Sequence, residues 1–241
     1  MFNLNNSVVI VTGGNNGIGL AIANGLVNHS AKVVRVDKFF NTKLNSEDYI
    51  LDLNDHKKIP KLVKEIFHKY GKIDGLVNAA GVSFSSENPY LDETIFDSTL
   101  SVNLKAIFIL CSSVCSFMAI KNFGSIVNIT SLGANLAFPN NPAYQISKAG
   151  LAQLTRSFAR DWVDKGIRIN NISPGYIKTS MTEKSFLDPI LNAERLNRMI
   201  IKRWGDPEDL IGPAIFLLSE ASKYITASDI SVDGGWASKG L

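Results

Sequence analysis

Tyr144 and Lys148 lie four residues apart in the stretch YQISK, so both side chains share one face of the helix expected there. A phenol with an ordinary pKa of about 10 is a poor acid–base catalyst at neutral pH. A neighbouring ammonium group favours the phenolate and lowers the pKa of the tyrosine. The pair therefore indicates proton exchange with a substrate hydroxyl or carbonyl group, although the same spacing also arises by chance between surface residues.

Two further polar residues stand in apolar surroundings. Ser131 ends the strand-like stretch SIVNITS, where its hydroxyl group can orient a reacting oxygen. Asn103 interrupts the apolar segment LSVNLKAIFIL, and a buried amide needs hydrogen-bond partners. The sequence leaves two interpretations of Asn103 open, namely that it satisfies a helix kink or that it holds a water chain.

The stretch TGGNNGIG at 12–19 follows the apolar run 8–11 and precedes a helix expected over 20–27. Gly13 and Gly17 lack a Cβ atom and let the backbone approach a pyrophosphate closely, while the helix N-terminus supplies amide donors. Gly19 is expected to let the helix pack tightly on the strand. The spacing Gly-x-x-x-Gly-x-Gly is not the commoner Gly-x-Gly-x-x-Gly, so a tight structural turn remains the alternative.

Asp37 ends the second expected strand, where a carboxylate can accept hydrogen bonds from the adenosine ribose hydroxyl groups. A 2′-phosphate there would meet a like charge, because Asn15 and Asn16 of the loop are neutral and Lys38 follows the acid instead of replacing it. A solvated turn aspartate is the alternative interpretation. The prediction is a cofactor site for NAD rather than NADP.

Seven short apolar runs alternate with helix-length segments, at 8–11, 32–36, 49–51, 74–78, 125–129, 167–172 and 230–232. Runs that are apolar throughout are typical of strands covered on both faces. The clearest helix is predicted over 59–70, with Pro60 in its first turn and Gly71 beyond it. The alternation predicts a doubly wound (Rossmann) α/β fold, with a parallel sheet of about seven strands and helices on both faces, forming one domain over 1–241.

The composition narrows the class of protein. The 241 residues are 45% apolar and 20% charged, with a net charge of +3 and no long basic run, so no nucleic-acid partner is expected. Cys111 and Cys115 are expected to be small core residues in a reducing compartment, and without a secretory leader the protein is expected in the cytoplasm. The most apolar stretch, 106–120, falls short of a membrane span. The three scattered histidines give no metal-ligand spacing, so no metal site is expected.

Taken together, these motifs resemble those of the short-chain dehydrogenases/reductases along essentially the whole chain. The glycine loop, Asp37 and YQISK carry the resemblance, with further matches in LDL around Asp52, SPGYIKT at 173–179, RWGDPEDL at 203–210 and DGGW at 233–236. NAAG at 78–81 departs from the family's usual Asn-Asn-Ala-Gly, with Ala79 in place of the second asparagine.

The resemblance implies a catalytic tetrad of Asn103, Ser131, Tyr144 and Lys148. Tyr144 would be the acid–base, Lys148 would bind the nicotinamide ribose and lower the tyrosine pKa, Ser131 would position the substrate, and Asn103 would anchor a proton-relay water. The residues expected to contact NAD are Gly13, Asn16, Gly17, Ile18, Gly19, Asp37, Asp52, Leu53, Asn78, Ala79, Ala80, Gly81, Tyr144, Lys148, Pro174, Gly175, Ile177 and Thr179.

The family also implies a homotetramer or homodimer, built through the long helices and the C-terminal strand. Phe108, Cys111 and Phe158 are candidates for that interface, although each is expected to belong to the core. Residues 178–204 are expected to form a mobile, mostly apolar substrate lid of one or two short helices, with Met181, Phe186, Leu187, Leu191, Leu196 and Met199 as its apolar residues.

Six cations against three acids in 178–203 either attract an anionic substrate, such as a sugar acid, nucleotide sugar or carrier-bound acyl chain, or form a solvated helix face. The lid resembles that of gluconate dehydrogenases. The leading hypothesis is therefore hydride transfer between NAD(H) and a small alcohol or ketone, of sugar, sugar-acid or polyol type. A ketoacyl-carrier-protein reductase and a non-catalytic nucleotide-binding protein are the alternatives.

Overall fold

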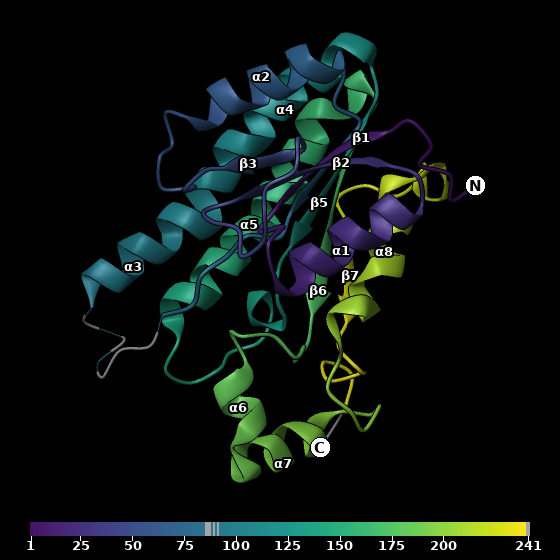
Figure 1. Cartoon of the computed structure of the whole chain (residues 1–241). Helices are drawn as coiled ribbons and strands as arrows, with labels where there is room; N and C mark the ends of the chain where they lie inside the picture. Colours follow the sequence, from purple (N-terminus) through teal and green to yellow (C-terminus); the bar gives the residue numbers. More distant parts are fainter. Residues whose placement is uncertain (85–87, 89, 91, 240–241) are drawn as a thin grey trace.

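Seven parallel strands form one sheet in the order β3-β2-β1-β4-β5-β6-β7 in the computed structural model, which describes residues 1–84, 88, 90 and 92–239 (Figure 1). The strands are β1 (Val8–Thr12), β2 (Lys32–Asp37), β3 (Asp48–Ile50), β4 (Gly75–Asn78), β5 (Gly124–Ile129), β6 (Ile167–Pro174) and β7 (Asp229–Val232). Each apolar run predicted to be a strand is one, with ends that shift by one or two residues. The predicted fold class is confirmed.

The strand order reverses direction between β1 and β4. After β1 the chain adds β2 and β3 on one side, then returns to place β4 against the other side of β1. Loops that leave the carboxyl ends of β1 and β4 therefore diverge, and a crevice opens between them, which is where open α/β sheets bind ligands.

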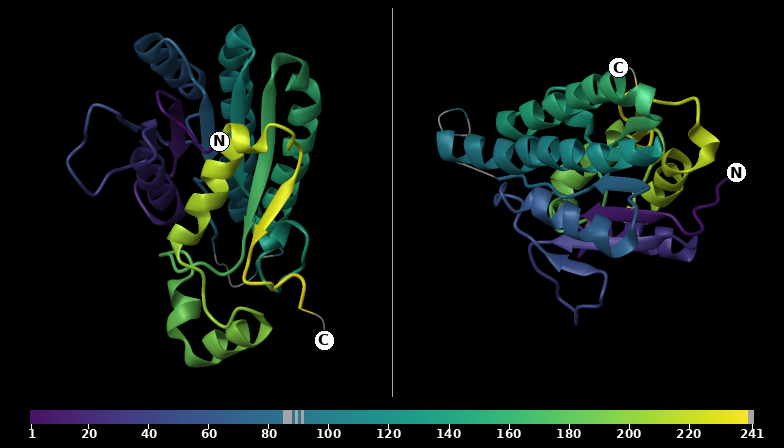
Figure 2. Two further views of the ribbon diagram at one scale, coloured as in Figure 1. Left: turned by 90° about the vertical axis from the view of Figure 1, so that its right-hand side faces the viewer. Right: turned by 90° about the horizontal axis from the view of Figure 1, so that it is seen from above.

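Helices cover both faces of the sheet (Figure 2). On one face lie α1 (Gly17–Asn28) and α8 (Ile211–Leu218), and on the other lie α2 (Ile59–Tyr70), α4 (Ile107–Lys121) and α5 (Pro142–Trp162). Alternation along β1 explains the two layers, because Val9 and Val11 join the core cluster of α1 and α8, whereas Val8 and Ile10 join that of α2, α4 and α5. Both faces are buried, so the strands are apolar throughout.

The helix ends agree with the sequence signals. Pro60 lies in the first turn of α2, and the helix ends at Tyr70, before Gly71 with φ of 71°. α1 begins at Gly17, three residues before the predicted start, so the glycine loop is itself part of the first helical turn.

The helix that carries Asn103 is longer than the sequence indicated. α3 (Glu93–Leu100), a π-helical turn (Ser101–Ala106) and α4 form one run, Glu93–Lys121, which has the length and apolar composition of a membrane span. Leu110, Val114 and Met118 of this run are fully buried in the core against the sheet, and a core helix passes the same test. The expectation that this helix is too short for a membrane span was therefore wrong about its length. Its buried residues are those of a core helix.

The three residues considered for core or interface differ from one another. Cys111 is completely buried and carries a free thiol, as does Cys115. Phe158 is partly buried and packs on the same core. Phe108 is 51% exposed and meets Phe158 edge-on, so the expectation that it belongs to the core is wrong.

The segment after β6 forms two short helices, α6 (Glu183–Leu187) and α7 (Pro189–Arg198), at the carboxyl edge of the sheet (Figure 1). This agrees with the expected one or two short helices. Met199 is buried and Phe186 packs edge-on against Trp204, whereas Leu187 is 67% exposed. The apolar residues of the segment therefore differ in their surroundings. Met199 is buried, Phe186 contacts an aromatic ring and Leu187 faces solvent.

Candidate active site

A cavity of about 500 Å³ opens at the carboxyl ends of the strands. It lies between the glycine loop, the turns after β2 and β4, the N-terminal half of α5 and the segment that follows β6. Of the residues expected to bind NAD or to act in catalysis, it is lined by Gly13, Asn16, Gly17, Ile18, Gly19, Asp37, Asp52, Leu53, Ala79, Ala80, Gly81, Ser131, Tyr144, Lys148, Pro174, Gly175, Ile177 and Thr179. Two expected residues, Asn78 and Asn103, do not line it.

The glycine loop leaves no room for side chains. Gly13 has φ of 69°, and a Cβ atom there would lie 2.8 Å from the Ala80 nitrogen. A Cβ atom on Gly19 would collide with the Gly13 carbonyl group and lie 3.2 Å from the carbonyl oxygen of Thr12, the last residue of β1, so the expected tight packing of the helix on the strand is confirmed. The side chain of Asn16 does not cap the first amides of α1, which leaves these donors for an anion. A cradle of this shape fits the pyrophosphate of a dinucleotide.

Backbone amides hold the carboxylate of Asp37 at the edge of this cavity. Its Oδ2 accepts a hydrogen bond from the Asn15 nitrogen at 3.0 Å, and its Oδ1 accepts one from the Lys38 nitrogen at 2.7 Å. These contacts fix the charge next to the loop, where the sequence placed the adenosine ribose.

The two cations beside Asp37 in the chain are engaged by other carboxylates. Arg35 forms a bidentate pair with Asp48, with distances of 2.7 and 2.6 Å. The Lys38 ammonium lies 2.9 Å from Asp52. A backbone hydrogen bond from Asn54 and the Lys38 contact lower the pKa of Asp52 below its usual value. Both cations therefore have carboxylate partners other than Asp37, although Lys38 also lines the cavity.

Helix α5 presents Tyr144 and Lys148 to the cavity from one face, next to Ser131 at the end of the loop after β5. The Lys148 ammonium donates a hydrogen bond to the Ile129 carbonyl oxygen at 2.8 Å and lies 5.7 Å from the centre of the Tyr144 ring. Burial lowers the pKa of Lys148 to about 8. The Ser131 hydroxyl accepts a hydrogen bond from the Gly133 nitrogen at 3.1 Å.

The pKa of Tyr144 differs in direction from the sequence expectation. Burial raises it, and a hydrogen bond with Ser131 lowers it by less. Lys148 is not among the causes of this shift, and its ammonium group bonds to the Ile129 carbonyl. The chain's own groups therefore leave Tyr144 a weaker acid than a free phenol, and this prediction was wrong for the protein alone.

Asn103 lies behind the cavity in the π-helical turn. Its Oδ1 accepts from the Val82 nitrogen at 2.8 Å, and its Nδ2 donates to the Val82 carbonyl at 2.8 Å and to the Ser147 hydroxyl at 3.1 Å. A Cβ atom on Gly81 would lie 3.4 Å from this Oδ1 and 3.5 Å from the Lys148 ammonium, so both groups flank one glycine. The helix distortion that the sequence allowed is present, and π-helical turns occur frequently at functional sites.

The side chain of Asn78 is buried and does not line the cavity, so its expected contact with the cofactor stays a prediction. Its Nδ2 donates to Asn128 Oδ1 at 2.7 Å. The register places Asn78, Asn128, Asn171 and Asp229 side by side across β4, β5, β6 and β7. We call these four residues the polar row.

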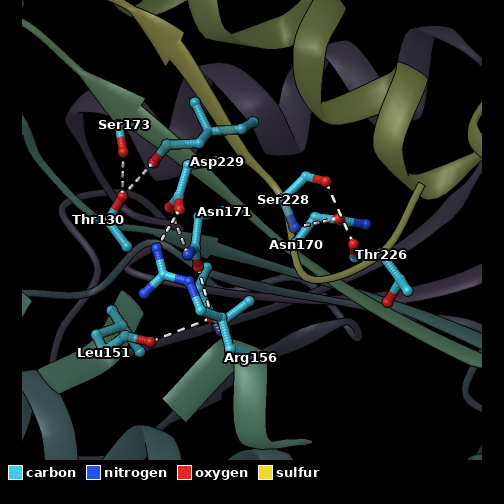
Figure 3. Close-up of polar contacts among 12 residues, drawn as sticks. Thr130, Leu151, Arg156, Asn170, Asn171, Ser173, Thr226, Ser228 and Asp229 are labelled. Carbon is cyan, nitrogen blue, oxygen red and sulfur yellow. Dashed lines mark hydrogen bonds and ion pairs between the residues drawn. The ribbon is translucent and has the colours of Figure 1, made fainter. Parts of the chain in front are cut away.

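Thr155 of α5 joins the polar row to the catalytic helix. Its hydroxyl accepts from Asn128 Nδ2 at 2.8 Å and lies 2.5 Å from Asn171 Oδ1. Figure 3 shows Asn171 and Arg156 converging on Asp229, at 2.6 and 2.8 Å. The row therefore fixes α5 to the sheet three turns beyond Tyr144. Polar residues in otherwise apolar strands mark its members in the sequence, but only strand register shows that they pair.

Sequence reasoning missed part of the cavity wall. The additional lining residues are Val36, Lys38, Phe39, Leu51, Asn54, Val82, Phe84, Val102, Ile129, Thr130, Ser180, Met181 and Thr182. Most lie in the last residues of a strand or in the loop that follows one, and that position is the signal that identifies them. Phe84 and Met181 are 44% and 49% exposed, so they offer apolar surface near Tyr144. Within the described ranges, no group of three or more metal-ligating side chains occurs.

The segment that matches known proteins includes all the residues that line the cavity. Residues 13–237 match the profile of the family described as enoyl-(acyl carrier protein) reductase. The chain is 33% identical to 2-dehydro-3-deoxy-D-gluconate 5-dehydrogenase of Escherichia coli, covering 99% of this chain and 98% of the relative. It is 32% identical to 3-oxoacyl-(acyl-carrier-protein) reductase of Thermotoga maritima, covering 96% and 98%. A crystal structure of gluconate 5-dehydrogenase from Burkholderia cenocepacia, in complex with NADP and tartrate, superimposes with a TM-score of 0.93 at 28% identity, covering 99% of this chain and 98% of that one.

Proposed function

The chain belongs to the short-chain dehydrogenase/reductase family and is an oxidoreductase acting on alcohol groups, and we propose that it transfers hydride between NAD(H) and a sugar-type secondary alcohol or its ketone. The observation that carries this proposal is the single cavity in which Tyr144, Lys148 and Ser131 meet the glycine cradle. A structural or purely nucleotide-sensing protein would have no use for this set of side chains beside the cradle.

The chain's own residues divide the work as follows. NAD, when bound, supplies the hydride acceptor. Ser131 orients the substrate oxygen, and Tyr144 takes the proton from the alcohol during oxidation and returns it during reduction. Because burial raises the pKa of Tyr144, the phenolate needs positive charge nearby, which Lys148 provides when protonated and the oxidised nicotinamide adds. We assign binding of the ribose to Lys148, whose ammonium group is anchored on the Ile129 carbonyl in the cavity wall.

In this scheme Asn103 acts through neighbouring residues. Its amide ties Val82, on the cavity wall, to Ser147 on α5, so it keeps the wall and the catalytic helix in register. We also assign to it the anchoring of a proton-relay water, supported by its position beside Gly81 and the Lys148 ammonium.

We propose NAD as the physiological cofactor. Asp37 presents negative charge where a 2′-phosphate would lie, and Arg35 and Lys38 are engaged by Asp48 and Asp52. A 2′-phosphate would therefore meet repulsion with neither of these cations free to compensate it. The Burkholderia relative was crystallised with NADP, so cofactor choice differs between the two proteins under this proposal.

Titration of the purified protein with NADH and with NADPH tests this choice. NADH should bind at least tenfold more tightly, a difference of about 1.4 kcal/mol. Asp37→Asn should reduce this difference in affinity between NADH and NADPH, chiefly by strengthening NADPH binding. Asp55→Asn, which removes an acid outside the cavity, should leave the difference unchanged. Equal affinity of the wild type for both cofactors would contradict the role given to Asp37.

For the substrate we propose a sugar acid or polyol. The gluconate-type activities of the relatives support this class, as does the tartrate, a polyhydroxy acid, bound by the Burkholderia protein. The second candidate is a ketoacyl-carrier-protein reductase, which the Thermotoga relative favours. Asp37 weighs against it, because reductive biosynthesis of that kind generally uses NADPH. Rates on a panel of polyols and sugar acids with NAD, and on a ketoacyl thioester with NADH and NADPH, separate the two.

We further propose a homotetramer, or a homodimer, that covers the exposed face of α4. Phe108 supports this with 51% of its surface exposed beside Phe158. Light scattering on the purified protein should give a mass two or four times that of the 26.3 kDa chain, and Phe108→Glu should lower it. A wild type that scatters as a single chain would contradict the assembly.

A further inference from the structure

A second cavity, of about 640 Å³, lies between the loop after the catalytic serine and the lid helix α7. It shares no lining residue with the cofactor cavity. Its wall consists of Leu136, Ala137, Phe138, Pro139, Glu194, Arg195, Asn197, Arg198 and Trp236. Two arginines one helical turn apart in an otherwise largely apolar wall require an explanation.

Aromatic rings hold both guanidinium groups in place. Arg195 lies over the ring of Tyr176, 5.0 Å from its centre, and Arg198 lies over Trp236 at 6.0 Å. The two rings pack on each other with centres 4.9 Å apart. Stacking on rings fixes a guanidinium group without using its N–H donors. The two cations therefore sit on neighbouring faces of one aromatic platform.

The donors of these arginines are free within the described residues. Neither guanidinium group donates a hydrogen bond to protein there; Arg198 is exposed to solvent, whereas the Nε of Arg195 is buried without a partner. The one carboxylate near Arg195 is Glu194, at 3.8 Å. By contrast, Arg203 of the same segment binds Asp209 at 2.6 and 2.9 Å, and Lys178 lies 3.3 Å from Asp206. A buried donor without a partner is costly, so an anion that fills this position stabilises it.

The arginines are not needed to cap α7. Lys202 donates to the carbonyl oxygens of Leu196 and Asn197, at 3.2 Å each, and Lys239 also donates to the Asn197 carbonyl. Basic residues near a helix C-terminus often serve this purpose, but here two lysines already serve it. The lysines also add positive potential at the same end of the cavity.

The platform adjoins the catalytic residues. Tyr176 stands between Gly175 and Ile177, which both line the cofactor cavity. On the other side, a Cβ atom on Gly133 would lie 3.5 Å from the Ser131 hydroxyl oxygen and 3.8 Å from the Phe138 ring. One glycine and one ring therefore separate the catalytic serine from the cavity that holds the arginines.

We propose that Arg195 and Arg198 bind the carboxylate of a polyhydroxy acid whose alcohol carbon lies at Tyr144, and so make the protein select sugar acids over uncharged polyols. The planar guanidinium fork matches a carboxylate bidentately. The selection rests on the proposed function, because it needs a sugar-type substrate at Tyr144. It adds to that function a binding site for the end of the substrate that is remote from the reacting carbon, and it specifies the negative charge that this end carries.

Gluconate and glucitol form the matched pair of substrates that tests the selection, since they differ at one end by a carboxylate in place of a hydroxymethyl group. The double variant Arg195→Gln/Arg198→Gln should raise the KM for gluconate at least tenfold. Its kcat/KM for glucitol and its Kd for NADH should stay within twofold of wild type. Lys184→Gln, which removes an exposed cation of the same lid outside both cavities, should change none of these values.

Two results would overturn the selection. The first is an equal loss of kcat/KM with gluconate and glucitol, which would mean that the arginines only support the lid. The second is an equal rise in the KM for gluconate in Lys184→Gln, which would mean that general positive potential is responsible.

A wild type that oxidises neither sugar would count against the proposed function, and binding then decides the selection separately. Calorimetric titration of gluconate into the NADH-loaded protein should show binding that the double variant loses at least tenfold and Lys184→Gln retains. No binding to wild type, or equal binding to wild type and the double variant, would overturn it.

Discussion

Burial sets the protonation of the two residues that matter most for proton transfer. The Lys148 ammonium is desolvated and bonded to the Ile129 carbonyl, and its pKa falls to about 8, while the pKa of Tyr144 rises. Under the proposed function, the positive charge of the oxidised nicotinamide would be needed to lower the tyrosine pKa, because burial alone favours the protonated phenol. Sequence spacing identified the pair but contained no information on desolvation, which depends on what packs around it.

The pKa of Lys148 predicts a pH-dependent contribution to stability. The folded pKa of about 8 lies below the ordinary 10.5, so between these values the unfolded chain binds more protons than the folded one. The free energy of unfolding of the wild type should therefore rise with pH, relative to that of Lys148→Met, by about 3 kcal/mol across this window.

Urea denaturation of both cofactor-free proteins at intervals between pH 7 and 10 measures that difference. Burial raises the pKa of the Cys111 and Cys115 thiols in both proteins, so their contribution cancels in the comparison. Parallel pH profiles would show that Lys148 keeps an ordinary pKa in the folded state.

At the scale of elements, helix α5 is fixed to the sheet by polar contacts. Thr155 meets Asn128 and Asn171 of the polar row, and Asp229 closes the row with Arg156 (Figure 3). Buried amides in strands are costly unless paired, and the register of four parallel strands pairs them. The row thereby specifies one position of α5, and with it the position of Tyr144.

Thr155→Val keeps the shape of the side chain but removes the hydroxyl group between Asn128 and Asn171. The change leaves two buried amides short of a partner, so we expect a loss of about 1–3 kcal/mol in the free energy of unfolding. Urea denaturation measures it, with Ser116→Ala as a control, because that hydroxyl bonds to its own helix in an exposed position. A loss for Thr155→Val no larger than that of the control would argue that the row adds little.

These elements also show how far the sequence predicts the structure. All seven strands and the bounds of α2 follow from apolar runs, proline and glycine, which are local signals. Asp37 and Ser131 are found because Asp37 ends β2 and Ser131 follows β5, and the same signals show where these strands end. The polar row depends on strand register, and the stacking of Arg195 on Tyr176 depends on how separate segments pack together. Neither therefore has a local signature in the sequence.

At the scale of the whole molecule, the reversal of strand order between β1 and β4 gathers the site. It brings the glycine cradle, Asp37 and the wall after β4 to one edge of the sheet, and α5 adds the proton-transfer residues. Helices α6 and α7 lie at the same edge, and α7 carries Arg195 and Arg198 of the second cavity. Under the proposed function, cofactor, reacting carbon and substrate charge would lie in sequence along this side.

The most direct test of this account compares Tyr144→Phe with the wild type in NAD reduction by whichever polyol or sugar acid the wild type oxidises best. The substitution removes one hydroxyl group and keeps the ring, so kcat should fall at least about 100-fold while the Kd for NADH stays within twofold. A variant that retains the wild-type rate would contradict the assignment of Tyr144 as the acid–base and with it the mechanism proposed for the protein.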